Sequence, residues 1–350
     1  MNAKTKQYYP IVAIKDNNLP EIIYIEKKEV DREEFIHNFS EDDPSKYWQI
    51  FPFPSFIKFG QPMLAINDII RVLKECKIID EERYFQYHKG NPYYWLGFSY
   101  FLINNYEAAV YYMNAAVSED LNWIPPNKPS PATDFIELKG QSEKQAAKDL
   151  VIYAEGKLKE LIEKYNLFIT YLGFAGGYLV SDFRRWFLTR AIDQPELNLQ
   201  SLATTFISFL LEHKQKIIQL DLVGDSTSND PFILHLFKGC LLLESLLKAN
   251  PKEKQIQTRG TLGKYLHNLG KQLNIETDFR YKPTTLQDVI NMVEEYNNTL
   301  DMAYEITLNF RNKAGHSLCW EINLGKEKYS KLFEIIGFCC LDTVFKLYNL

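Results

Sequence analysis

The stretch FRNKAGHSL, residues 310–318, places arginine, amide and imidazole side chains within a few positions of one another. Apolar, helix-like sequence lies on both sides of it. Arginine binds the oxygen atoms of anionic groups, and histidine exchanges a proton near neutral pH. Arg311, Asn312 and His316 are therefore the clearest candidates in this chain for chemistry that combines anion binding with proton transfer.

The spacing of these residues restricts how they could meet. Arg311 and His316 are five positions apart, which is an offset of about 140° around an α-helix. The two side chains would not share a face of a regular helix, and Gly315 between them would weaken a continuing one. A local distortion or a second subunit would be needed to bring them together.

The elements that must position this stretch are helical. Residues 232–250 are nearly wholly apolar, which predicts a buried helix. Residues 284–310 predict one long helix, opened by Thr284 and Gln287 as a capping pair. Residues 326–350 predict the last helix. The C-terminal third is therefore expected to be a bundle of four or five helices.

In this setting the motif resembles that of the HEPN superfamily. Its members often carry R-x(4–6)-H late in a helical bundle, frequently as R-N-x-x-x-H, and Arg311, Asn312 and His316 match that order. The apolar residues 236–248 resemble an early helix of such a domain, with Glu244 as a polar residue inside it. The resemblance covers about residues 228–350 and does not extend to the N-terminal part.

This resemblance implies an endoribonuclease that needs no metal or cofactor and acts as a homodimer with a composite active site. It assigns the phosphate to Arg311, proton transfer at the 2′-hydroxyl or the leaving 5′-oxygen to His316, and orientation of the histidine or a phosphate contact to Asn312. The product would carry a 2′,3′-cyclic phosphate. A role in stress or phage defence is implied in the same way. Further candidates for RNA contact are Lys313, Glu244 and His267.

Simpler roles are open for the same residues. Arg311 and His316 could cap the long helix, because cations near a helix C-terminus interact favourably with its dipole. Glu244 could be a buried acid paired with a lysine or arginine, and Lys313 and His267 could be solvated surface residues. The protein would then be a non-catalytic helical scaffold or partner-binding protein with a degenerate HEPN domain.

The N-terminal part is organised differently. Residues 1–62 are mainly irregular and contain two β-like runs around a turn, which predicts a β-hairpin. Residues 63–221 predict a helical domain for docking a protein partner. Within it, residues 93–120 predict an αα-hairpin, where Gly97 and Ala109 permit close approach of two helices. This hairpin resembles a single tetratricopeptide repeat.

Two further features concern the middle of the chain. Residues 221–231 are small and polar and end in proline, which predicts the boundary before the third region, 228–350. Arg184 and Arg185, before Trp186, are either a site for an acidic partner or an ordinary helix surface. The fold is thus expected to be mainly all-α with a small β element at the N-terminus.

Composition limits the other functional classes. The 350 residues, 46% of them hydrophobic, suggest about two domains. A net charge of −5 weighs against a basic RNA-binding surface, so an RNA contact would be local. Five cysteines without C-x-x-C spacing argue against disulfides and a zinc site. The N-terminus lacks a signal-peptide pattern, and the longest near-apolar run falls short of the ~18 residues that cross a membrane. We expect a cytoplasmic protein with no membrane partner.

Overall fold

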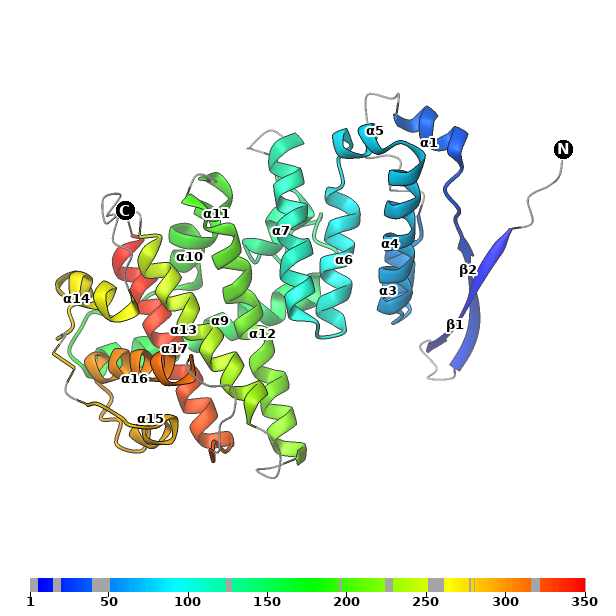
Figure 1. The fold of residues 1–350 in the computed structure, drawn as a ribbon. Helices are drawn as coiled ribbons and strands as arrows, with labels where there is room; N and C mark the ends of the chain where they lie inside the picture. Colours follow the sequence, from blue (N-terminus) through cyan, green and yellow to red (C-terminus); the bar gives the residue numbers. More distant parts are fainter. Residues whose placement is uncertain are drawn as a thin grey trace. The chain divides into compact units, whose positions relative to one another are not determined.

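The computed structural model describes residues 6–14, 20–39, 51–123, 128–194, 197–223, 229–250, 261–276, 278–279, 281–315 and 322–349. These residues are mainly helical, with one small two-stranded sheet, which confirms the predicted fold class (Figure 1). The chain forms two compact units, Met1–Thr133 and Asp134–Leu350. The boundary predicted at 221–231 therefore lies inside the second unit.

The first unit begins with the predicted β-hairpin. Strands β1 (Gln7–Ile14) and β2 (Pro20–Lys27) pair antiparallel. Because side chains alternate between the faces of a strand, Ile11 and Ile25 pack into the helical core while Val12 and Ile22 are exposed on the other face.

Helices make up the rest of the first unit. The predicted αα-hairpin is confirmed, with a turn in which Asn104 has a left-handed φ of 65°. A Cβ atom at Gly97 would lie 3.0 Å from the backbone nitrogen of Met113, so glycine permits the close approach of the two helices. The helices are α1 (Arg32–Phe39), α3 (Phe53–Lys58), α4 (Pro62–Ile79), α5 (Glu81–Gln86), α6 (Gly90–Leu102) and α7 (Tyr106–Trp123), the last two forming the hairpin.

The second unit is a bundle of helices (Figure 1). Helix α8 (Pro131–Ile136) begins in the first unit and ends in the second, because the boundary falls between Thr133 and Asp134. The elements that follow are α9 (Lys148–Tyr171), α10 (Val180–Phe183), the π-helix η1 (Arg184–Leu188), α11 (Thr189–Asp193), α12 (Gln200–Val223), α13 (Asp230–Lys248), α14 (Leu262–Leu273), α15 (Leu286–Met292), α16 (Leu300–Ala314) and α17 (Lys326–Leu347).

Helix α17 is the centre of this bundle. It contacts α9, α12, α13, α14 and α16, and most of its side chains are buried. Cys339 and Cys340 lie in its core, as does Cys240 of α13. Burial raises the pKa of all three thiols.

A buried carboxylate joins α17 to two neighbours. Asp342 accepts hydrogen bonds from the hydroxyls of Tyr165 on α9 at 2.6 Å and Tyr304 on α16 at 2.9 Å. Lys346 lies 2.9 Å from the same carboxylate. Burial raises the pKa of Asp342, and the positive charge of Lys346 opposes that shift. The bond from Tyr304 fixes α16 against α17, and α16 carries Arg311, Asn312 and Lys313.

The single long helix predicted over residues 284–310 is wrong. The structure has two helices there, α15 and α16, separated by residues 293–299. Asn298 has a left-handed φ of 57°, and the hydroxyl of Thr299 accepts the backbone N–H of Met302 as an N-cap. Asparagine and threonine favour such turns and caps over helix interiors. The opening capping box also differs, since it pairs Thr285 with Asp288.

Candidate functional site

Arg311, Asn312 and Lys313, the part of the motif that the structure describes, lie on α16, and α13 packs beside this helix. Most residues of α13 are buried, which confirms the predicted buried helix, and Leu234 and Leu241 are its exposed leucines. One exception to its apolar character is Glu244, near the C-terminal end. On α16, Arg311 occupies the last turn, close to the end of α13.

An ion pair connects the two helices at this point. Nε of Arg311 donates to Oε2 of Glu244 at 3.0 Å, and Nζ of Lys248 lies 2.7 Å from Oε1 of the same carboxylate. The Glu244 side chain is 6% exposed, and that of Arg311 is 26% exposed. The alternative that Glu244 is a buried acid with a basic partner is therefore confirmed. A buried carboxylate needs such partners, because an unpaired one is strongly destabilising.

The printed contact uses only part of the arginine. Nε of Arg311 binds Glu244, and the two terminal nitrogens of its guanidinium form no hydrogen bond with another described residue. Lys248 adds a second cation, and its ammonium lies 5.5 Å from the ring centre of Tyr265 on α14. Two positive charges and one negative charge thus meet at this place, which we call the Arg311 site: Arg311, Glu244 and Lys248.

Helix α16 ends at Ala314, three residues after the arginine. The N–H of Gly315 donates to the carbonyl of Arg311 at 3.2 Å, and a Cβ at Gly315 would lie 3.3 Å from the ring of Phe237. Asn312 and Lys313 are half-buried on this last turn. His316 lies outside the described residues, so the distance between it and Arg311 stays a prediction.

The other sequence candidate is on a different helix. His267 is an exposed residue of α14, as expected for a surface histidine. Lys248 is a member of the Arg311 site that the sequence analysis missed. The sequence did contain a signal for Lys248, because it follows Glu244 by four positions, and residues at positions i and i+4 of a helix are neighbours on its surface.

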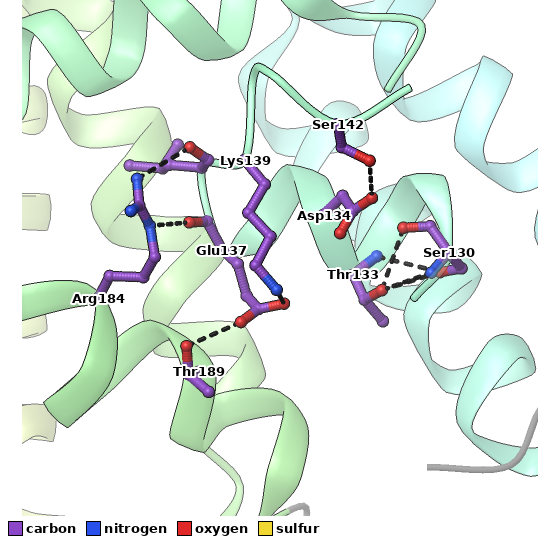
Figure 2. Close-up of polar contacts among 9 residues, drawn as sticks. Ser130, Thr133, Asp134, Glu137, Lys139, Ser142, Arg184 and Thr189 are labelled. Atoms are coloured by element: carbon purple, nitrogen blue, oxygen red, sulfur yellow. Dashed lines mark hydrogen bonds and ion pairs between the residues drawn. The ribbon is translucent and has the colours of Figure 1, made fainter. Parts of the chain in front are cut away.

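A second polar cluster lies at the start of the second unit, around Glu137 and Arg184 (Figure 2). The guanidinium of Arg184 donates to the carbonyl oxygens of Glu137 at 2.8 Å and Leu138 at 3.2 Å, and it pairs with Glu155 at 2.8 Å. Leu138 is buried with a left-handed φ of 54°, which is strained for a leucine. Arg184 therefore stabilises a strained turn, and its hydrogen bonds are directed to groups of the protein itself.

The remaining residues of this cluster are also satisfied internally. The Glu137 carboxylate accepts from the Thr189 hydroxyl at 2.7 Å and pairs with Lys139 at 2.7 Å (Figure 2). Arg185 is exposed, pairs with Asp182, and lies 5.1 Å from the ring of Trp186. This arrangement agrees with the ordinary helix-surface interpretation of Arg185.

Two histidines lie between α12, α13 and α17, of which His235 is buried and His213 is half-buried. Nε2 of His235 is 3.0 Å from the carbonyl oxygen of Phe209, and its Nδ1 is 2.7 Å from the hydroxyl of Tyr329. Since a carbonyl only accepts, Nε2 carries the proton and Nδ1 accepts from the tyrosine. Burial lowers the pKa of His235 to about 3, and burial likewise lowers that of His213 to about 3.

Comparisons and composition add little to these observations. Among the described residues, no group of three or more His, Cys, Asp or Glu side chains is arranged to hold a metal ion. In the same part of the chain, no helix has the length and apolar character needed to cross a membrane. Comparison with protein-family models, with curated proteins and with solved structures gives no match.

Proposed function

We propose that this chain is a metal-independent endoribonuclease of the HEPN type, active as a homodimer. The observation that carries the proposal is the Arg311 site. An arginine five residues before a histidine is held by a buried carboxylate from a neighbouring helix, and within the described part of the chain its terminal nitrogens have no other partner. A fixed planar guanidinium binds two phosphate oxygens better than a mobile one, because less side-chain freedom is lost.

The proposed reaction is an internal transfer of the phosphodiester. His316 takes the proton of the ribose 2′-hydroxyl, whose oxygen attacks the neighbouring phosphorus. The bond from phosphorus to the 5′-oxygen breaks, and that oxygen receives a proton from a second acid, for which the partner's copy of the motif is the candidate. Arg311 stabilises the extra negative charge on the phosphoryl oxygens. The products are a 2′,3′-cyclic phosphate and a 5′-hydroxyl.

A second candidate follows from the same ion pair. Because Glu244 satisfies part of Arg311 inside the protein, the pair also suits a helical scaffold in which the motif joins α13 to α16. The αα-hairpin of the first unit would then be the surface for a protein partner, as in the tetratricopeptide repeats that it resembles. Cleavage activity separates the two candidates.

Purified protein is expected to cleave single-stranded RNA in the presence of excess EDTA, because the proposed chemistry uses only side-chain groups. Gel analysis of end-labelled RNA would follow cleavage, and treatment with phosphatase before and after acid would identify the cyclic phosphate. Cleavage that stops with EDTA and returns with magnesium would contradict the mechanism. Absence of cleavage by a stable dimer across varied RNAs would favour the scaffold.

The carboxylate of the Arg311 site gives a second test. Glu244→Gln is expected to lower kcat/KM for RNA by about 10-fold, because the neutral amide holds the guanidinium less firmly. It should also lower the free energy of unfolding by about 1–3 kcal/mol, since two cations lose a buried partner. Cleavage assays and chemical denaturation measure the two effects separately.

A matched control is available in the same unit. Glu212 on α12 is also largely buried and pairs with Lys238 of α13. Glu212→Gln should destabilise the protein similarly and leave kcat/KM unchanged. If both variants lose the same activity, Glu244 acts through stability alone and does not position Arg311.

A further inference from the structure

A small cavity lies in the second unit where α9, α12 and α17 meet. Each of these helices contacts the other two, and each contributes side chains to the lining. The cavity volume is about 60 Å³. One water molecule needs about 10–15 Å³ of such space, so there is room for about four or five non-hydrogen atoms. We call it the His213 cavity, and all of its lining residues belong to the part of the chain that the structure describes.

Part of the lining is apolar. Leu161 comes from α9, Leu210 from α12 and Phe333 from α17, and all three side chains are buried. Because these residues belong to the packed core of the bundle, they hold the shape of the cavity. A ligand that fills the cavity must present an apolar group to them.

The lining histidine has a polar atom without a partner. Nε2 of His213 is buried and forms no hydrogen bond with another described residue. The ring lies face to face with that of Phe333, with the ring centroids 3.8 Å apart. Most buried polar atoms in proteins are satisfied by a side chain, the backbone or a bound molecule, and an unsatisfied one is destabilising. This nitrogen therefore points to a bound group independently of the cavity.

The charges near the histidine favour an anion. Burial is the largest cause that lowers the pKa of His213 to about 3, and the charges of His235, Lys157 and Lys164 lower it further, whereas Glu160 opposes them. The ring is therefore neutral near pH 7 and has one N–H to donate. The lysine charges that disfavour a second proton on the ring also favour an anion beside it.

Both lysines line the cavity and also have carboxylate partners. Nζ of Lys157 lies 2.7 Å from Glu160, and Lys164 pairs with Glu334. The Glu160 side chain is 61% exposed, so water weakens its attraction to the lysine. An ammonium group has three N–H donors, so each lysine can bind an anion and retain its glutamate.

The apolar and polar parts of the lining together select a small carboxylate. A metal ion is disfavoured, because the described residues contain no suitable group of ligands. Inorganic phosphate would place charged oxygen atoms against the apolar side chains. A carboxylate on a short alkyl chain satisfies both parts of the lining.

We propose that the His213 cavity binds an aliphatic carboxylate of two or three carbon atoms. One carboxylate oxygen accepts the N–H of His213, the other faces the ammonium of Lys157, and the alkyl group contacts Leu210 and Phe333. This proposal does not depend on RNA cleavage, because no residue of the Arg311 site lines the cavity.

Propionate is the probe for the first experiment, which is saturation-transfer NMR on the full chain at constant ionic strength. Binding is expected with a Kd on the order of 1 mM, as suits so small a ligand. Hexanoate should bind at least about 10-fold more weakly, because its chain exceeds the cavity. On an open apolar surface each added methylene would instead strengthen binding by about fourfold. Affinity that rises from propionate to hexanoate would therefore overturn the proposal.

Two variants test the polar contacts. His213→Phe keeps a ring against Phe333 and removes the nitrogen atoms, so it should fold and weaken propionate binding by roughly 5- to 10-fold. Lys157→Gln should weaken binding by roughly 3- to 10-fold through loss of one charge contact. Thermal unfolding establishes that each variant is folded. Unchanged affinity in folded His213→Phe protein would contradict the proposed site.

The matched control is Lys159→Gln. Lys159 lies on the same helix, is exposed, pairs with Glu163 at 3.9 Å and does not line the cavity. This variant should bind propionate within about twofold of wild type. Equal losses in the two glutamine variants, or displacement of propionate by an equal concentration of chloride, would show non-specific attraction of anions and overturn the proposal. Tighter binding of N-acetylaspartate amide than of propionate would overturn it in favour of a carboxylate side chain from a protein partner.

Discussion

Replacing His316 by alanine is expected to lower the rate of RNA cleavage by about 10²–10⁴-fold. Proton transfer by a positioned side chain contributes a factor of this size, and no other histidine stands in the motif. Arg311→Ala should have a comparable effect. Arg311→Lys should recover little of it, because an ammonium group cannot form the paired contacts of a planar guanidinium. Single-turnover cleavage of labelled RNA measures each rate.

The control for this experiment is His267→Ala. His267 is an exposed histidine on α14 of the same unit, and loss of one exposed phosphate contact should cost no more than about 10-fold. Circular dichroism and thermal unfolding establish that each variant is folded. Wild-type cleavage by pure, folded His316→Ala protein would end the ribonuclease proposal, and equal losses in both histidine variants would remove the special role of His316.

Acidification is expected to destabilise the protein strongly through His235. This side chain is 3% exposed, and its folded pKa of about 3 lies below the ordinary value of 6.5. A depressed pKa means that the unfolded chain binds the proton first. Stability is therefore fully present above about pH 6.5 and is lost as the pH falls towards 3. At pH 4 the loss from this residue alone is about 3 kcal/mol.

His235→Gln isolates this contribution. Glutamine retains a donor for the Phe209 carbonyl and an acceptor for the Tyr329 hydroxyl but does not titrate. Chemical denaturation at a series of pH values should show that unfolding near pH 5 takes up about one proton fewer in the variant than in wild type. His213, whose pKa is depressed in the same direction, leaves a residual dependence. Parallel stability curves for the two proteins would show that His235 is not the source.

The sequence predicted the framework well and the local exceptions poorly. The apolar run of α13, the β-hairpin and the α6–α7 hairpin follow from periodicity and from small residues at a close approach, which are local signals. Periodicity did not predict the interruption between α15 and α16. The asparagine and threonine residues there fit the helical period, but such residues favour turns and helix caps over helix interiors. The left-handed Leu138 has no local signal at all, since Arg184 stabilises it from a distant part of the chain.

The candidate site shows the same division. The motif order identified Arg311 from the sequence, and the isolated polar character of Glu244 identified it as unusual. Their pairing spans 67 positions in the chain, so only the packing of α13 on α16 could establish it. Lys248 differs, because it lies four residues after Glu244 on the same helix and could have been included from the sequence.

The buried cysteines are chemical probes of local opening of the fold. Cys76 lies in the first unit, whereas Cys240, Cys339 and Cys340 lie in the second, and all four thiols are buried. Thiol reagents attack the thiolate, so modification must wait for a fluctuation that exposes the sulfur. The rate of labelling at each position then measures the free energy of opening around it. Cys240 and the α17 pair thereby report how often α13 and α17, which pack against each other, separate.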